Sequence, residues 1–286
     1  MGDHYTPRKY LLGFCDPAAS GHLWAYDKLT KRHFRTTVGN VAHENGFYSP
    51  EDEAELNRCV EMPANPVLDN LRSGKPITAE DRIKLALYIA TFIYRVPHKR
   101  ELFARGAPEV FEESLEKFRG FLEQASAAGA IKLEVLQYRM GELDAVRKKY
   151  AGDPALLIQE QLRSPWPCEE VCELIFRMNW RLLRSSGPSY FMTSDNPAFF
   201  FSSMGLGKPE SELSFPLSTE LLLHGCWHHG SVQCQHFDAK QKCVKEINRR
   251  TASSSTRFLF YHKQESWVAQ LGDKNPDGHL LNRIPW

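Results

Sequence analysis

Strand-like segments at both ends of this chain of 286 residues enclose a long helical segment, and this order limits its fold most strongly. Near the N-terminus, two runs rich in aromatic and β-branched residues flank a polar turn at 28–32, which predicts a β-hairpin over 22–38. After Gly187-Pro188, short apolar runs predict strands at 190–193, 198–201, 221–226 and 257–262. Because neither end has enough strands to bury an apolar face alone, we expect both to enter one sheet.

Helical periodicity dominates the middle of the chain. Thr78 and Asp81 form a cap signal ahead of apolar residues at three- and four-residue spacing, which predicts a helix that ends before Pro97. A helix that starts at Pro50 is expected to be short, since prolines 63 and 66 interrupt it. Further helices are expected after Pro108, over 131–150, from Asp153-Pro154, from Pro167 toward Leu183, and over 244–253.

The order of these segments predicts an α+β fold. A mixed or antiparallel sheet, built from the N-terminal and C-terminal regions, is expected to pack against a central multi-helix segment, with the helices of 78–183 on one side. No linker or repeat divides the chain, so residues 1–286 are predicted to form a single domain. Its parts are an N-terminal β-hairpin region (1–50), a helical middle (78–183) and a C-terminal β-rich region (188–286).

Composition excludes several classes of protein. Apolar residues make up 42% and charged residues 25%, which is typical of a soluble globular protein and not of disordered or disulfide-scaffold chains. A formal charge of +1 provides no global attraction for a polyanion. The longest apolar stretch, 85–94, is about half of the roughly 20 residues that cross a bilayer, so no membrane contact is expected. Seven cysteines without an export signal predict free thiols and a cytoplasmic location.

Two short segments concentrate groups that could perform chemistry. His4, Tyr5 and Arg8 place an imidazole, a phenol and a guanidinium at a terminus, and histidine is the commonest general base. The alternative is that Tyr5 and Tyr10 merely anchor the terminus. Asp195 and Asn196 stand between two strand-like runs, where an aspartate could orient a histidine, although Ser-Asp-Asn-Pro is equally typical of a turn.

Arg95 lies at the end of an apolar helix, where its guanidinium could bind a carboxylate or phosphate. The basic residues that follow, Lys99 and Arg100, are better explained by the negative end of the helix dipole.

Histidines and cysteines are dense between residues 224 and 243, but their spacing does not predict zinc. The candidates are His224, Cys226, His228, His229, Cys234, His236 and Cys243, and they lack the C-x2-C with H-x3-5-H pattern. Cys168 and Cys172 are one helical turn apart and are interpreted as core residues. Motifs of P-loop, Rossmann, α/β-hydrolase and HExxH enzymes are absent, and neither a cofactor nor a metal is expected.

Several short motifs together resemble the family known as domain of unknown function 4238. They are His4-Tyr-Thr-Pro-Arg-Lys-Tyr-Leu-Leu-Gly-Phe14, Trp24-Ala-Tyr-Asp27, Phe47-Tyr48-Ser49, Tyr94-Arg95-Val-Pro97, Thr193-Ser-Asp-Asn-Pro197 and Pro216-Leu-Ser218, in that order. The resemblance implies a single intracellular domain, found widely in microbes, without an established activity. It gives weight to His4, Arg95, Asp195 and Asn196, which match polar positions of the motifs.

One region departs from the family pattern. The resemblance implies a longer helix with paired glutamates between Glu51 and Gly74, whereas the two prolines predict an interruption there. No role is therefore assigned to Glu55 or Glu61.

Two hypotheses about function follow. In the first, the protein is a hydrolase in which His4 acts as acid or base, Asp195 orients it or activates water, and Asn196 donates to an oxyanion. Arg95, with Arg8 and Tyr5, would bind an anionic substrate such as a phosphodiester, either a small molecule or a nucleic acid. In the second, the protein is a non-catalytic module that binds protein or nucleic acid, and the same residues are internal struts.

Overall fold

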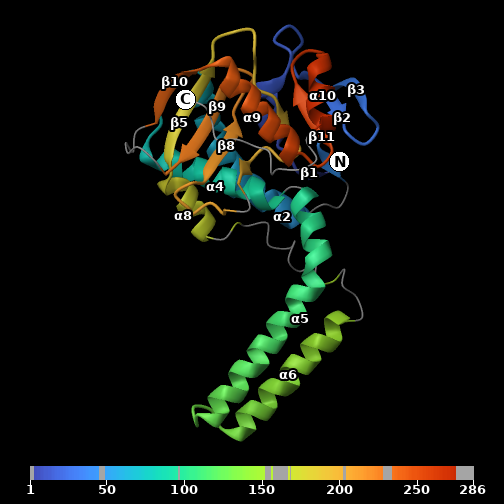
Figure 1. Cartoon of the computed structure of the whole chain (residues 1–286), viewed down its shortest axis with the longest axis vertical. Coiled ribbons are helices and arrows are strands. Elements are labelled where there is room, and N and C mark those ends of the chain that lie inside the picture. Colours follow the sequence, from blue (N-terminus) through green and yellow to red (C-terminus); the bar gives the residue numbers. More distant parts are fainter. Residues whose placement is uncertain are drawn as a thin grey trace. The chain divides into compact units, whose positions relative to one another are not determined.

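The computed structural model of the chain describes residues 3–44, 49–95, 97–151, 156, 167, 169–201, 204–227 and 234–274 (Figure 1). The chain divides into two compact units. The larger unit comprises Met1–His98 and Pro165–Trp286, and the smaller unit comprises Lys99–Ser164.

The predicted hairpin enters an antiparallel sheet of four strands in the larger unit. Its order is β3 (Arg32–Thr37), β2 (His22–Asp27), β11 (Phe258–Tyr261) and β6 (Thr193–Ser194). Each neighbouring pair is antiparallel, and Leu259 on β11 stands opposite both Tyr26 and Ser194. The hairpin and the meeting of N-terminal with C-terminal strands are thus confirmed, and the fold is α+β.

The expectation of one shared sheet is wrong, because the other C-terminal strands form a second sheet. Its order is β10 (Gln235–Ala239), β5 (Asn179–Ser185), β9 (Leu221–Cys226), β8 (Glu212–Pro216) and β7 (Phe199–Phe200). The sheet is mixed, since β10 runs parallel to β5 and the other pairs are antiparallel. Strand β5 lies where the sequence predicted the end of a helix, and it gives this region enough strands to bury its own faces.

Helices cover both faces of the five-stranded sheet (Figure 1). On one face, Leu182, Leu221 and Leu223 pack into a core shared with α3 (Met62–Arg72), α4 (Ala79–Arg95) and α8 (Glu169–Arg177). On the other face, Leu183 and Leu222 pack against α9 (Gln241–Ser254). Side chains alternate between faces along a strand, so the sheet needs cover on both. Helices α4 and α8, which belong to the predicted 78–183 segment, thus lie on one face, and α9, which lies outside that segment, covers the other.

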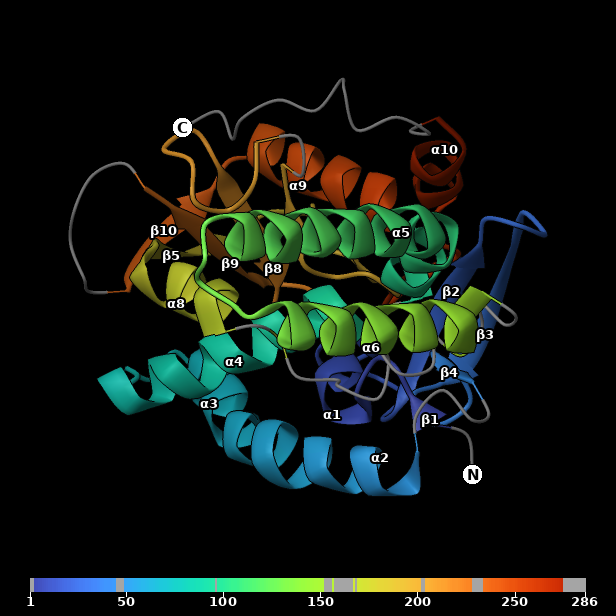
Figure 2. The same ribbon diagram turned by 90° about the horizontal axis from the view of Figure 1, so that it is seen from below.

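The helix that begins at Pro50 is longer than the sequence predicted. Helix α2 (Pro50–Leu56) continues through a π-helical turn, η2 (Asn57–Glu61), into α3, so the path is helical from 50 to 72 (Figure 2). Proline lacks an N–H and its ring crowds the preceding turn. The wider π turn ends two residues before Pro63, where it accommodates both the missing N–H and the proline ring.

Other predicted helix boundaries agree with the structure. Ser49 caps α2 by accepting a hydrogen bond from the Asp52 amide at 3.1 Å. Thr78 and Asp81 form the expected reciprocal cap of α4, which ends at Arg95. Helix α9 is present as predicted, and α10 (Ser266–Lys274) follows β11. The helix predicted from Asp153-Pro154 lies outside the described residues.

A short N-terminal layer completes the larger unit. Strand β1 (Asp3–His4) pairs antiparallel with β4 (His43–Glu44), and α1 (Arg8–Leu11) leads into a 3-10 turn, η1 (Leu12–Phe14).

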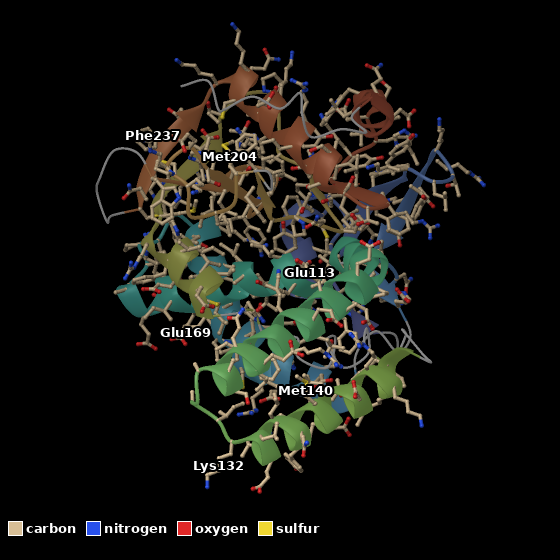
Figure 3. All side chains as sticks on the ribbon, turned by 60° about the horizontal axis from the view of Figure 1, so that its bottom comes forward. Glu113, Lys132, Met140, Glu169, Met204 and Phe237 are labelled. Atoms are coloured by element: carbon tan, nitrogen blue, oxygen red, sulfur yellow. The ribbon has the colours of Figure 1, made fainter. Side chains whose placement is uncertain are left out.

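The smaller unit is a helical hairpin. Helix α5 (Pro97–Ala127) and α6 (Leu133–Ala151) are joined by a turn that ends beside Lys132 (Figure 3). Ion pairs from Arg119 to Asp144 and from Arg147 to Glu112 join the two helices. The sequence predicted that the first helix starts after Pro108, but α5 begins 11 positions earlier and includes that proline. Among the described residues, no helix has both the length and the apolar character to span a membrane.

Candidate functional site

Arg95 is the centre of a buried group of charges in the larger unit. Its side chain is 3% exposed at the end of α4. One terminal nitrogen donates to the main-chain carbonyl of His4 and to Glu53 Oε2 at 3.1 Å, and the other donates to Glu61 Oε1. Two carboxylates and a carbonyl therefore hold the guanidinium in place.

The π-helical turn explains how two glutamates reach one arginine. In a regular α-helix, residues seven apart lie on nearly the same face, and residues eight apart do not. Glu53 and Glu61 are eight apart, but the π turn between them takes up one extra residue. Both carboxylates consequently come to the side of α2 and η2 that faces Arg95. Sequence periodicity gives no signal for this pairing, so Glu53 was missed and Glu61 received no role. Glu55 instead lies exposed, with its carboxylate 4.0 Å from Arg58.

His4 lies next to this arginine, with its ring enclosed by basic groups. Arg8 Nε donates to His4 Nε2 at 2.8 Å, and the ring of His43 stands edge-on at 5.4 Å between centroids. Burial lowers the pKa of His4 to about 4, and the charges of Arg8, His43 and Arg95 act in the same direction, against a backbone hydrogen bond with Val41. Because Nε2 accepts a hydrogen bond, the neutral ring carries its proton on Nδ1. His4 is therefore an uncharged imidazole at neutral pH.

Arg8 differs from Arg95 in its exposure. It lies at the surface, and its terminal nitrogens have no partner within the described part of the chain. Its positive charge can thus be offered to a ligand, whereas that of Arg95 is neutralised by Glu53 and Glu61. We call His4, Arg8, Glu53, Glu61 and Arg95 the Arg95 cluster.

Asp195 makes a different set of contacts, all with main-chain amides at the start of β11. Its carboxylate accepts hydrogen bonds from the amides of Thr256 at 2.9 Å, Arg257 at 2.6 Å and Phe258 at 2.9 Å. Burial raises the pKa of Asp195 to about 6, although the three amides and Lys28 lower it. The side chain is 1% exposed. These contacts join the turn after β6 to β11.

Asn196 continues this turn toward α9. Its side-chain amide donates to the carbonyl of Ser254 at 2.9 Å, and the Ser254 hydroxyl donates to the Asn196 carbonyl at 3.1 Å. Asn196 thus ties the turn after β6 to the last turn of α9.

The structure brings His4, Arg8 and Arg95 together. Asp195 and Asn196 instead form hydrogen bonds with the start of β11 and the end of α9. Neither hydrogen bond nor ion pair joins His4 to Asp195 among the described residues. Tyr5 connects the two groups, because it follows His4 in the chain and the charge of Asp195 adds to burial in raising the pKa of its phenol. The tyrosine is buried, with 5% of its surface exposed.

The N-terminal segment also docks beside β6, as the hypothesis of a shared site requires. The Tyr10 hydroxyl lies 2.7 Å from Thr193 Oγ1 and donates to the Pro216 carbonyl at 2.8 Å. No exposed surface remains on Tyr10. Tyr5 and Tyr10 thus anchor the terminus.

The histidine and cysteine region contains a buried charge network. His224 Nε2 on β9 lies 3.5 Å from Glu212 Oε2, and Arg250 on α9 donates to the same carboxylate oxygen at 2.7 Å. Within the described residues, no three His, Cys, Asp or Glu side chains are placed to hold a metal ion. His228, His229 and Cys168 lie outside that part.

Comparison with known proteins leaves the activity open. No curated protein and no solved structure matches the chain. A family whose description reads "Protein of unknown function (DUF4238)" matches residues 3–265, which include every member of the Arg95 cluster and both Asp195 and Asn196. The chain therefore belongs to the DUF4238 family.

Proposed function

We propose that the protein is a hydrolase for anionic substrates and that His4 is its acid–base residue. The observation that carries the proposal is a buried, neutral imidazole whose Nε2 accepts a hydrogen bond from an exposed arginine, Arg8. Titratable groups with perturbed pKa values that meet from distant segments are typical of functional sites. The cysteine content favours a cytoplasmic location.

Arg8 would couple substrate binding to the activation of His4. An anionic group, such as a phosphodiester, forms a bidentate contact with the guanidinium and draws it away from His4 Nε2. The negative charge of the substrate then raises the pKa of His4 toward neutrality. Nε2, now uncovered, accepts a proton from the attacking water, and the imidazolium later returns a proton to the leaving group.

The remaining predicted site residues fit positioning roles in this scheme. Arg95 holds the His4 carbonyl and is itself held by Glu53 and Glu61, so it fixes the histidine. Asp195 and Tyr5 stabilise the surface against which the N-terminal segment packs.

The alternative is a non-catalytic module that binds protein or nucleic acid. The hydrogen bonds of Asp195 and Asn196 favour it, because those groups are occupied by the fold itself. In that case the same residues would only stabilise the fold.

A hydrolysis screen of wild type and variants tests the proposal. The substrates are phosphodiesters, phosphomonoesters, carboxylic esters, RNA and DNA. For at least one anionic substrate, His4→Gln is expected to reduce kcat about 100-fold or more, and Arg8→Gln is expected to raise KM. Matched controls, His22→Gln and Arg32→Gln on the β2–β3 hairpin, should retain activity. Wild-type inactivity on the whole panel, or full activity of His4→Gln, would replace the hydrolase with the binding module.

A further inference from the structure

A cavity lies far from the Arg95 cluster. Its volume is about 490 Å³, and it is bounded by the segment between α3 and α4, the C-terminal end of α8 and strands β5 and β10. Arg82 in its wall and Arg95 lie 13 residues apart on α4, which corresponds to about 20 Å along the helix. The volume is in the range that accommodates small molecules.

The chemistry of the wall points to an anion with an apolar body. Leu71, Ile77, Phe176 and Leu182 provide the apolar surface. The basic side chains in the wall are Lys75, Arg82 and His236, and none of the described lining residues is acidic. The lining therefore combines apolar contact with positive or proton-donating groups.

Arg82 is a fixed part of this wall. Its Nε donates to the Phe176 carbonyl at 2.9 Å, and Nη2 donates to the carbonyl of Met178. The guanidinium also lies 4.1 Å from the centroid of the Trp180 ring. The positive charge cannot swing away from the cavity, because three neighbours hold it.

Lys75 and His236 stand at the rim and are free to bind. Both side chains are exposed, and neither has a partner in the described part of the chain. The nearest acids on α4 are already engaged, since Glu80 pairs with Lys84 at 2.7 Å and Asp81 accepts from the Thr78 amide at 3.0 Å.

We propose that this cavity binds a small amphipathic anion, with an apolar body against Leu71, Ile77 and Leu182 and a single anionic head at Lys75 and His236. The head is a carboxylate or a phosphate, which share the charge and the acceptor oxygens that these donors require. The site is independent of the proposed hydrolase.

Isothermal titration calorimetry on the full chain tests this inference. The probes are octanoate and octyl phosphate, with octanol as the neutral control and acetate as the control without an apolar body. At least one of the two anions is expected to bind, about 10-fold or more tightly than octanol, and acetate is expected not to bind measurably. The stronger of the two anions identifies the head group. Equal binding of octanol, or no binding of either anion, would overturn the proposal.

Variants locate the binding in the cavity. Lys75→Gln and His236→Gln are each expected to weaken the anion about 5-fold or more, and the matched surface variant Lys208→Gln should bind as wild type does. Ile77→Trp fills the cavity and should abolish binding of the anion. Thermal unfolding verifies that each variant is folded. Lys75 and His236 are exposed, so their variants are expected to fold and can test the site even if Ile77→Trp does not fold. Unchanged affinity in both rim variants would exclude this cavity as the site.

Discussion

Asp195 shows how a polar side chain can serve the fold at a position that resembles a catalytic one. Three consecutive amides, those of residues 256–258, donate hydrogen bonds to this carboxylate. A buried donor that loses its acceptor costs about 1–3 kcal/mol. The free-energy cost of removing the carboxylate therefore depends on whether water can accept the hydrogen bonds of these amides, at a position that is 1% exposed.

Replacement of Asp195 by alanine is accordingly expected to lower the free energy of unfolding by about 3 kcal/mol or more. This differs from the small change in melting temperature expected of a purely catalytic residue. Urea denaturation measures the effect, and Asp238→Ala, at an exposed position of β10, is the control that should change stability by less than about 0.5 kcal/mol. A stable Asp195→Ala protein without activity would restore a catalytic role for the carboxylate.

His4 is expected to make stability depend on pH between about 6.5 and 4. The unfolded imidazole binds a proton below pH 6.5, whereas the folded one does so only below a pKa of about 4. Stability is therefore lost as pH falls through this window, by at most about 3 kcal/mol. His4→Gln should remove that part of the loss.

The measurement is urea denaturation of both proteins at several pH values. Other histidines contribute to the wild-type curve, since burial also lowers the pKa values of His33, His224 and His262. The difference between the two curves isolates His4. Parallel curves would show that the ring is not shielded from protons in the folded state.

At the scale of elements, Arg72 joins three parts of the larger unit. From the last turn of α3 its guanidinium donates to the carbonyls of Tyr10 at 2.8 Å, Lys9 at 3.2 Å and Leu217 at 2.8 Å. Helix α1 is thereby bound to α3 and to the turn after β8. Gly13 leaves the room for this contact, because a Cβ there would lie 2.6 Å from both Arg72 Nη2 and the Leu217 carbonyl oxygen.

Gly13→Ala is expected to destabilise the protein by about 2–4 kcal/mol, since the methyl group both overpacks the site and displaces hydrogen bonds of Arg72. Chemical denaturation measures the change. The control is Gly187→Ala, where a Cβ would meet no atom within 4 Å. If the two variants are equally stable, Arg72 does not depend on the space that Gly13 provides.

At the scale of the whole molecule, the chain divides into the larger unit and the helical hairpin, each of them compact. The described hydrophobic clusters of the larger unit include no residue of Lys99–Ser164. The hairpin has its own contacts, such as the ion pairs from Arg119 to Asp144 and from Arg147 to Glu112. The prediction of a single domain for 1–286 can therefore be tested directly.

Replacement of Lys99–Ser164 by a flexible linker of about ten Gly and Ser residues should leave the larger unit folded. We expect one cooperative thermal transition, with a midpoint within about 5 °C of the full chain, by circular dichroism. Retention of the His4-dependent pH profile would show that the Arg95 cluster is intact. Failure to fold would support the single domain that the sequence predicts.

Local patterns were enough to predict much of the fold. The β2–β3 hairpin, α4 with its Thr78 cap, α6 and α9 each carry a periodicity or turn signal within a short stretch. Such signals fail where tertiary pairing decides the structure. Strand β5 was predicted as helix because its neighbours β9 and β10, which supply its hydrogen bonds, come 36 or more residues later in the chain.

The candidate site divides in the same way. The residue types at His4, Arg8 and Arg95 singled them out in the sequence, because imidazole and guanidinium groups are unusual at a terminus or within an apolar helix. Only the tertiary structure shows that the histidine contacts both arginines, while Asp195 is hydrogen-bonded to main-chain amides instead. It also adds Glu53 and Glu61, which the π turn brings to Arg95. The physical reason is that chemical identity and local periodicity are written along the chain, whereas contact between segments as distant as 4, 53 and 95 depends on how the helices and sheets pack.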